Sequence, residues 1–254
     1  MVVVNKKLNT LDLFAGIGGF SYGLEKTGLY STKYFCEWDS VAQQVLKKHW
    51  PDVKCFGDIK ELRGSDVDDI DIITGGFPCQ DISLAGKGAG LGGDRSSHWY
   101  HYLRLIDEIK PKGCIIENVS ALRSRGLDTV LRGLDAVGYD AEWHCITAKH
   151  LGAYHERDRL FILAYPRSRG VSGFNALVNL EKVGQGWEGC KADLQQVYDN
   201  PLRRSDRFPQ PLLRGSDVRP AGWVDRLKQV GNSVYWPIVE KLGYHMYENV
   251  KDYV

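Results

Sequence analysis

Residues 10–20 read TLDLFAGIGGF, and this stretch is the strongest indication of fold in the sequence. Its first residues predict a short buried strand, and the glycines from Gly16 to Gly19 allow a tight turn after it. A helix is expected to begin near Ser21 and to end near Gly28. Strand, glycine turn and helix in this order open a nucleotide-type α/β unit. A glycine turn alone is a weak indication of a ligand, because such turns also connect packed elements.

The composition is that of an ordinary globular protein. The chain has 254 residues, of which 43% are hydrophobic and 26% charged, and its formal net charge is +1. The length fits one large domain or one domain with a small insert. The near-neutral charge provides no global positive field, although a local basic cleft remains compatible with it. No apolar run is long enough to span a membrane, and no signal peptide is expected at the N-terminus.

The spacing of the cysteines bears on disulfides and metal binding. Six cysteines are scattered along the chain without a Cys-x-x-Cys pair. This spacing predicts neither a disulfide framework nor a zinc ribbon, and we expect no metal. A reducing, cytoplasmic location follows as an expectation.

Two further strands are expected to end in carboxylates. Residues 33–36 lead to Glu37 and Trp38, about twenty positions beyond the glycine turn, where an acidic residue accepts hydrogen bonds from ribose hydroxyls. Trp38 could cover the face of an adenine. The alternative makes Glu37 a helix-capping carboxylate and Trp38 a rim aromatic. Residues 56–59 place Asp58 at the same edge, where it either hydrogen-bonds an adenine amino group or caps the turn.

A fourth strand, residues 70–74, leads directly into the sequence GGFPCQ at 75–80. The two glycines allow a tight turn, and Pro78 restricts the approach to Cys79. Cys79 is therefore predicted at the carboxyl end of a strand, where open α/β sheets bind ligands. Most free cysteines are small buried apolar residues, but this turn favours a nucleophile. The glycine-rich residues 83–97 are interpreted as a lid or binding loop.

The next strand is expected to bring a carboxylate beside Cys79. Residues 113–116 form an apolar run that ends in Glu117, and a parallel sheet would place Glu117 next to Cys79. This carboxylate either stays ionised or has a raised pKa and carries a proton. The preceding helix is predicted over residues 99–109, with four residues facing the core: Trp99, Tyr102, Leu103 and Ile106.

Two arginines are expected on one face of a later strand. Residues 155–164 read HERDRLFILA. Arg157 and Arg159 are two positions apart, so in an extended strand both side chains point to the same face. The alternative makes them surface salt-bridge partners of Glu156 and Asp158. A helix over 128–138, a strand over 139–148 and a final helix over 237–247 complete the expected elements.

The composition of the chain changes after residue 166. Residues 167–222 are short of apolar periodicity and rich in Arg, Gly, Asp and Pro, with aromatic residues among the arginines. This predicts a small loop-rich insert. Arginines interleaved with aromatics suit phosphate and base contacts, although solvated surface loops have a similar composition.

The motifs together resemble a known family. In chain order they are LDLFAGIGGF at 11–20, CEWD at 36–39, GDI at 57–59, GGFPCQ at 75–80, ENV at 117–119, HERDR at 155–159 and GNSV at 231–234. This series is similar to that of DNA (cytosine-5)-methyltransferases of the bacterial and phage type. The resemblance covers residues 8–165 and 223–245.

The resemblance implies a fold and a domain organisation. It implies an α/β, Rossmann-like S-adenosylmethionine-dependent methyltransferase fold with a small loop-rich target-recognition domain. Residues 1–166 would form the catalytic and cofactor-binding domain, and residues 167–222 the recognition domain. Residues 223–254 would return to complete the catalytic domain.

The resemblance also implies roles for individual residues. Cys79 would attack carbon 6 of a flipped-out cytosine, forming a covalent intermediate, and Glu117, Arg157 and Arg159 would surround the base. The methyl group would pass from S-adenosylmethionine to carbon 5. The expected cofactor-binding residues are Phe14, Gly16, Gly18, Glu37, Trp38, Asp58, Ile59, Pro78, Asn232 and Val234. The expected DNA-binding residues are Gln80, Ser83 and Arg95.

Double-stranded DNA is the implied partner. A role in restriction-modification or in phage DNA protection would add a cognate restriction nuclease, and we expect a monomer without membrane association. The alternatives are an RNA (tRNA) cytosine-5 methyltransferase and a catalytically silent DNA-binding homologue. A nucleotide-binding oxidoreductase is disfavoured by the placement of Cys79, Glu117 and the two arginines.

Overall fold

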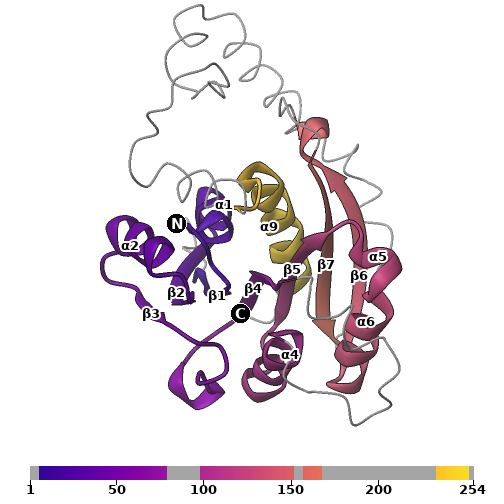
Figure 1. The fold of residues 1–254 in the computed structure, drawn as a ribbon, viewed down its shortest axis with the longest axis horizontal. Coiled ribbons are helices and arrows are strands. Elements are labelled where there is room, and N and C mark those ends of the chain that lie inside the picture. Colours follow the sequence, from indigo (N-terminus) through magenta and orange to yellow (C-terminus); the bar gives the residue numbers. More distant parts are fainter. Residues whose placement is uncertain (1–5, 79–97, 152–156, 168–232, 252–254) are drawn as a thin grey trace, which may run out of the picture. The chain divides into compact units, whose positions relative to one another are not determined.

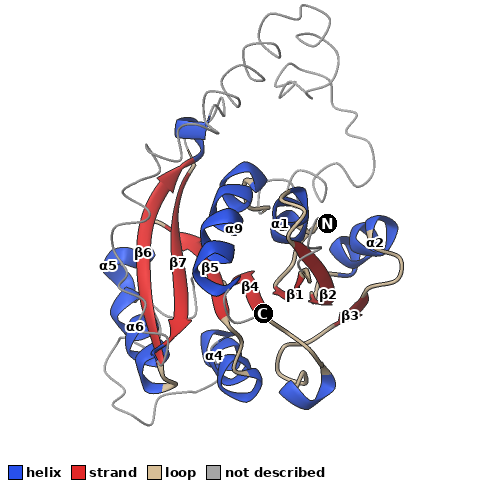
Figure 2. Ribbon diagram, turned by 180° about the vertical axis from the view of Figure 1, so that it is seen from behind, coloured by secondary structure: helices blue, strands red, loops and turns tan. Residues whose placement is uncertain are grey.

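The structure, a computed structural model, describes residues 6–78, 98–151, 157–167 and 233–251. These residues belong to one compact unit. They form a seven-stranded sheet with helices packed on both of its faces (Figures 1 and 2). The expected α/β class is thereby confirmed. Apart from Arg167, the stretch 167–222 lies outside the described residues.

The strand order indicates where in the sheet a ligand is expected. The order is β3-β2-β1-β4-β5-β7-β6, and strands β1 to β5 pair in parallel whereas β7 runs antiparallel to both neighbours. Successive strands extend from β1 toward β3 on one side and from β4 toward β5 on the other. Ligands are expected at the carboxyl ends of the strands where the strand order reverses in this way. The bounds are β1 Leu8–Leu13, β2 Tyr30–Cys36, β3 Lys54–Phe56, β4 Ile72–Gly76, β5 Gly113–Val119, β6 Tyr139–Thr147 and β7 Asp158–Pro166.

The helices begin and end close to the expected positions. Their bounds are α1 Gly19–Lys26, α2 Ser40–His49, α4 His98–Ile109, α5 Leu122–Arg125, α6 Leu127–Ala136 and α9 Trp236–Val250. The short helix α5 and the 3-10 turns Gly64–Asp66 and Ala148–Leu151 were not expected. Such short segments carry too little periodicity to stand out in a sequence.

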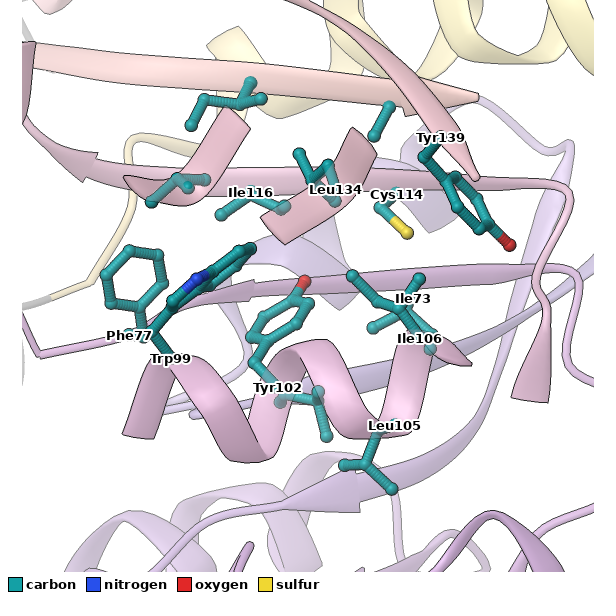
Figure 3. Packing of buried hydrophobic residues seen from close by; sticks show 14 of the residues in the cluster. Ile73, Phe77, Trp99, Tyr102, Leu105, Ile106, Cys114, Ile116, Leu134 and Tyr139 are labelled. Carbon is teal, nitrogen blue, oxygen red and sulfur yellow. The ribbon is translucent and has the colours of Figure 1, made fainter. Parts of the chain in front are cut away.

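Helix α4 packs one face on the sheet. Trp99, Tyr102, Leu105 and Ile106 are fully buried, although Leu105 was not among the residues expected to face the core. Leu103 was expected there, and it is partly buried and packs against the core. Figure 3 shows Trp99, Tyr102 and Ile106 between the helix and the strands, with the Trp99 ring beside Phe77. The two ring centroids are 5.2 Å apart. Each buried side chain of this size stabilises the fold by about 1.5–3 kcal/mol, and the Trp99 contact also fixes the residue that precedes Pro78.

Helices α1 and α9 pack closely against each other (Figure 1). A Cβ atom on Gly23 would lie 2.7 Å from the carbonyl oxygen of Trp236, so α9 approaches the backbone of α1. Tyr30 donates a 2.6 Å hydrogen bond from its hydroxyl to the carbonyl oxygen of Gly243. This packing brings Ser233 against the glycine turn, since a Cβ atom on Gly19 would lie 2.7 Å from Ser233 Oγ.

The described part of the chain contains neither a membrane-spanning helix nor a metal-binding cluster. No helix within it has the length and apolar character needed to cross a membrane. Its His, Cys, Asp and Glu side chains form no group of three or more that could hold a metal ion.

Candidate active site

A cavity of about 920 Å³ opens at the carboxyl ends of the central strands. This volume is in the range of pockets that bind cofactors and other small molecules. Described residues that line it are Phe14, Gly16, Cys36, Glu37, Trp38, Asp39, Gly57, Asp58, Ile59, Lys60, Gly76, Phe77, Pro78, His98, Glu117, Asn118, Val119, Arg157 and Arg159.

Glu37 ties the glycine turn to the end of β2. Its Oε2 accepts a 2.7 Å hydrogen bond from the N–H of Gly16, and its Oε1 accepts one of 2.7 Å from the N–H of Asp39. The cap of helix α2 is Asp39, whose Oδ1 accepts from the N–H groups of Val41 and Ala42. Glu37 is therefore not the helix cap. Each of its oxygens keeps a second lone pair for a ligand hydroxyl.

Two aromatic side chains reach the cavity from β1 and β2. Trp38 is 75% exposed although it is a large aromatic residue. Phe14 adopts a left-handed backbone conformation, with φ at 52°, which is uncommon for a residue other than glycine. Its ring meets His98 edge-to-face at 5.6 Å and lies nearly parallel to Tyr102 at 6.4 Å. Helix α4 thus holds Phe14 in place.

Asp58 follows β3 and caps a turn. Its Oδ1 accepts a 2.9 Å hydrogen bond from the N–H of Lys60, which agrees with one of the two alternatives for this residue. The carboxylate also lines the cavity. Ile59 beside it is buried and supplies an apolar part of the wall.

Glu117 lies directly across from the turn that leads to Cys79. Gly76 in β4 pairs with Glu117 in β5, and a Cβ atom on Gly76 would lie 2.6 Å from Glu117 Oε2. The carboxylate therefore occupies the space beside this glycine. Gly75 has φ at 151°, and a Cβ atom there would collide with the carbonyl oxygen of Leu13. These contacts explain why two glycines precede Phe77.

Arg159 forms an ion pair with Glu117. The Nε of Arg159 lies 2.8 Å from Glu117 Oε1. The antiparallel pairing of β5 with β7 sets Val119 opposite Arg159, so the guanidinium reaches back along β5. Arg157 lines the same cavity. The interpretation of Arg159 as a surface partner of Asp158 is wrong for its side chain, although Nη1 donates to the carbonyl oxygen of Asp158.

The environment shifts the pKa values at this end of the cavity. Burial raises the pKa of Glu117, and the positive charges of Arg159 and Arg157 oppose this effect only in part. Burial and the neighbouring Arg159 lower the pKa of Arg157, but a guanidinium still stays protonated in proteins. Glu117 is thus a carboxyl group that holds a proton more readily than an exposed glutamate.

Asn118 holds the turn before Cys79. This buried side chain donates a 2.9 Å hydrogen bond from Nδ2 to the carbonyl oxygen of Phe77. Its Oδ1 accepts from the N–H of Val119. Sequence reasoning did not assign a role to Asn118 or to His98. Asn118 could have been found from its position directly after Glu117, a carboxylate at a strand end. A buried amide needs hydrogen-bond partners, so an amide at this position is expected to bind nearby backbone groups.

The structure brings most of the expected site residues to one cavity. Those that line it are Phe14, Gly16, Glu37, Trp38, Asp58, Ile59, Pro78, Glu117, Arg157 and Arg159. Two others do not: Gly18 is the N-cap of α1 and packs against Trp50, and Val234 packs against Gly19. The remaining ones lie outside the described residues: Cys79, Gln80, Ser83, Arg95 and Asn232.

The sheet order and the cavity define the class of the protein, which is the S-adenosylmethionine-dependent methyltransferase fold. The family profile described as C-5 cytosine-specific DNA methylase matches residues 8–192. The chain therefore belongs to the C-5 cytosine-specific DNA methylase family.

Individual relatives agree with this assignment. The Type II methyltransferase M.CviJI of Paramecium bursaria Chlorella virus IL3A is 36% identical over 201 residues, which are 77% of this chain and 54% of the relative. A candidate DNA modification methyltransferase encoded within an E. coli prophage is 26% identical, with a TM-score of 0.53 over 66% of this chain and 49% of the other. The chain spans about half the length of the curated relatives it matches.

A more distant structure supports the fold alone. The S. pombe Dnmt2 methyltransferase has a TM-score of 0.58 and 19% identity, and the match covers 70% of this chain and 54% of that one.

Proposed function

We propose that this protein transfers a methyl group from S-adenosylmethionine to carbon 5 of cytosine in double-stranded DNA. The observation that carries the proposal is the ion pair of Glu117 and Arg159 beside Gly76, three residues before Cys79. This pair shares one cavity with the carboxylate and the exposed aromatic ring at Glu37 and Trp38. Membership of the C-5 cytosine-specific DNA methylase family supports DNA and cytosine as the substrate.

The β1–β3 end of the cavity would hold the cofactor. Glu37, oriented by two backbone N–H groups, would accept hydrogen bonds from the ribose hydroxyls. Asp58 would accept one from the adenine amino group, and Phe14 and Trp38 would pack on the adenine ring. Gly16, Ile59 and Pro78 complete this wall. Bound S-adenosylmethionine supplies an electrophilic methyl group there.

The β4–β5 end would activate the cytosine. The Cys79 thiolate adds to carbon 6, and the electron pair of the carbon 5–carbon 6 double bond makes carbon 5 nucleophilic. Glu117 in its protonated form donates to ring nitrogen 3, which favours this addition, and its raised pKa suits that role. Arg159 or Arg157 would stabilise negative charge on the carbonyl oxygen. After carbon 5 is methylated, a base removes its proton and the carbon–sulfur bond breaks, which restores the thiolate.

The DNA contacts form the other half of the proposal. A cytosine inside a duplex is out of reach of these groups, so the base has to be flipped out. We assign Gln80, Ser83, Arg95 and the arginine-rich stretch 167–222 to DNA contacts. Relatives that are named Type II methyltransferases support a role beside a cognate restriction nuclease. The proposal further includes that the protein acts as a monomer in the cytoplasm.

A substrate comparison tests the proposal. The protein is incubated with labelled S-adenosylmethionine and either unmethylated duplex genomic DNA or tRNA, and bisulfite sequencing then locates methylcytosine. We expect label in DNA only, and none with Cys79→Ser, which should still bind the cofactor. Duplex DNA with 5-fluorocytosine should trap a covalent complex with the unchanged protein. Label in tRNA alone, or undiminished turnover by Cys79→Ser, would contradict the proposal.

A further inference from the structure

Arg104 on helix α4 binds the backbone of the cavity wall. Its Nη2 donates to the carbonyl oxygens of Ile59, at 3.1 Å, and Leu62, at 2.7 Å. Its Nη1 donates to Glu108 Oε1 at 2.7 Å, one helical turn further along α4. One guanidinium therefore holds two carbonyl groups of a loop and one carboxylate of its own helix.

Glu108 extends this connection to the end of the same loop. Its second oxygen, Oε2, accepts a 2.6 Å hydrogen bond from the N–H of Gly64. A Cβ atom on Gly64 would lie 2.7 Å from Glu108 Cβ, so the loop approaches the helix closely at this point. Residues 59–64 are thus fastened to α4 at both ends.

The fastened loop begins in the wall of the cavity. Asp58, Ile59 and Lys60 all line the cavity. One of the two carbonyl groups that Arg104 binds is that of Ile59, the residue after Asp58. The first residue of α4, His98, contacts Phe14 on the neighbouring wall. A single helix therefore sets the positions of two walls that belong to β1 and β3.

We propose that Arg104 is a positioning residue for the cofactor, because its guanidinium fixes the backbone from which Asp58 and Ile59 meet the adenine. The inference rests on the proposed function and adds a residue that does not itself line the cavity. Arginine suits this role because its planar fork carries five N–H donors, whereas a lysine ammonium is a single compact centre. Hydrogen bonds from a charged donor are also stronger than neutral ones.

Cofactor binding measured on three variants tests the proposal. Arg104→Gln, Arg104→Lys and the control Lys110→Gln are compared with the unchanged protein by calorimetric titration with S-adenosylhomocysteine. Lys110 lies just beyond the end of α4 and pairs with Asp107 at an exposed position, so its replacement also removes an ion pair. We expect Arg104→Gln to raise the Kd about tenfold, Arg104→Lys to raise it less, and Lys110→Gln to leave it unchanged.

A positioning role also predicts a specific kinetic pattern. The KM for S-adenosylmethionine should rise with the Kd, whereas kcat at saturating cofactor and the KM for DNA should stay within about twofold. A general loss of structure would instead lower kcat and both affinities together, and melting followed by circular dichroism would reveal it.

The outcomes of these measurements separate this inference from the proposed function. An unchanged Kd in a folded Arg104→Gln protein overturns the inference alone, and so does a loss of kcat without a change in cofactor binding. If Arg104→Gln does not fold, the Arg104→Lys variant tests the inference instead. A Kd of Arg104→Lys for S-adenosylhomocysteine equal to that of the unchanged protein then overturns the inference. If the unchanged protein binds no S-adenosylhomocysteine, the proposed function falls as well.

Discussion

The Nε of Arg159 lies 2.8 Å from Oε1 of Glu117, and this ion pair joins strands of opposite direction at the edge of the cavity. Glu117 is largely buried, with 14% of its side chain exposed. Removing one member of such a pair leaves the other charge buried without compensation, which is costly. The pair is therefore a sensitive place to test both the chemistry and the electrostatics of the site.

Replacing Glu117 by glutamine should lower the rate of methyl transfer. The amide cannot deliver the proton that the cytosine ring needs, and general acid catalysis contributes about 10²–10⁴-fold to rates. The kcat with duplex DNA should fall by this order, while the Kd for S-adenosylhomocysteine stays unchanged. Glu142→Gln is a matched control, because Glu142 is also buried and hydrogen-bonded, to Tyr165 and His245. An equal loss of kcat in both variants would contradict the assignment.

Replacing Arg159 by glutamine should raise the pKa of Glu117. Burial already raises this pKa, and the positive charge of Arg159 is the largest effect that opposes burial. Without it, the protonated carboxyl persists to higher pH. Carbon-13 NMR of labelled glutamate carboxyl groups, recorded against pH, measures the change directly. A pKa that falls or stays constant would show that the ion pair does not control the proton on Glu117.

Replacing Asn118 by aspartate should slow the reaction by disturbing the turn before Cys79. The new side chain can still accept from the N–H of Val119, but it has no donor for the carbonyl of Phe77. Leaving a buried group unpaired costs about 1–3 kcal/mol, and we expect the free energy of unfolding and kcat both to fall. Asn249→Asp, which removes a hydrogen bond to the carbonyl of His245, provides the comparison. A lower stability with an unchanged kcat would restrict Asn118 to a structural role.

Asp12 should make the stability of the fold depend on pH. Burial raises its pKa to about 7, and hydrogen bonds from Ser21 and Thr74 offset this only in part. Because the folded pKa lies above the unfolded one, its stabilising contribution is complete below about pH 4. The contribution is lost as the pH rises through 7, by up to about 1.4 kcal/mol per pH unit.

Urea unfolding between about pH 5 and 8 checks this dependence. The unchanged protein should lose stability over this range because of Asp12, and Asp12→Asn should lose less. Exposed Asp128→Asn is the control. The same slope in Asp12→Asn and the unchanged protein would mean that Asp12 is ionised in both the folded and the unfolded state.

Replacing Gly75 by alanine should destabilise the fold strongly. The new Cβ would meet the carbonyl oxygen of Leu13, and the backbone has positive φ, so we expect a loss of about 3 kcal/mol or more. Gly28→Ala is the matched control, because Gly28 also has positive φ but leaves open space for a Cβ. The control should lose about 1–2 kcal/mol. Equal losses in chemical denaturation would show that β1 can move away from β4.

Much of the fold follows from local sequence patterns. Apolar runs that end in a polar residue predicted the strands before Glu37, Cys79 and Glu117, and the glycine turn predicted α1. A parallel arrangement predicts Glu37 and Glu117 at one edge without any knowledge of long-range contacts, and both line the cavity there. Those predictions required only periodicity and turn chemistry.

Contacts that depend on strand register could not be predicted in the same way. The Arg159–Glu117 pair requires β7 to lie antiparallel beside β5, and the residues at 155–159 do not reveal their neighbour. Arg104 illustrates the same limit, because its partners Ile59 and Leu62 are more than forty residues away in sequence. The family resemblance predicts Gly18 in the cofactor pocket; the structure places it at the N-cap of α1, next to Trp50.

The packing of α9 on α1 has a consequence for synthesis of the protein. The hydrogen bond from Tyr30 to Gly243 closes a separation of 213 residues. Ribosomes add about 5–20 residues per second, so roughly ten to forty seconds pass between the synthesis of these two partners. During this time the nascent chain has α1 without its companion helix. Full assembly around the glycine turn thus has to await the synthesis of α9.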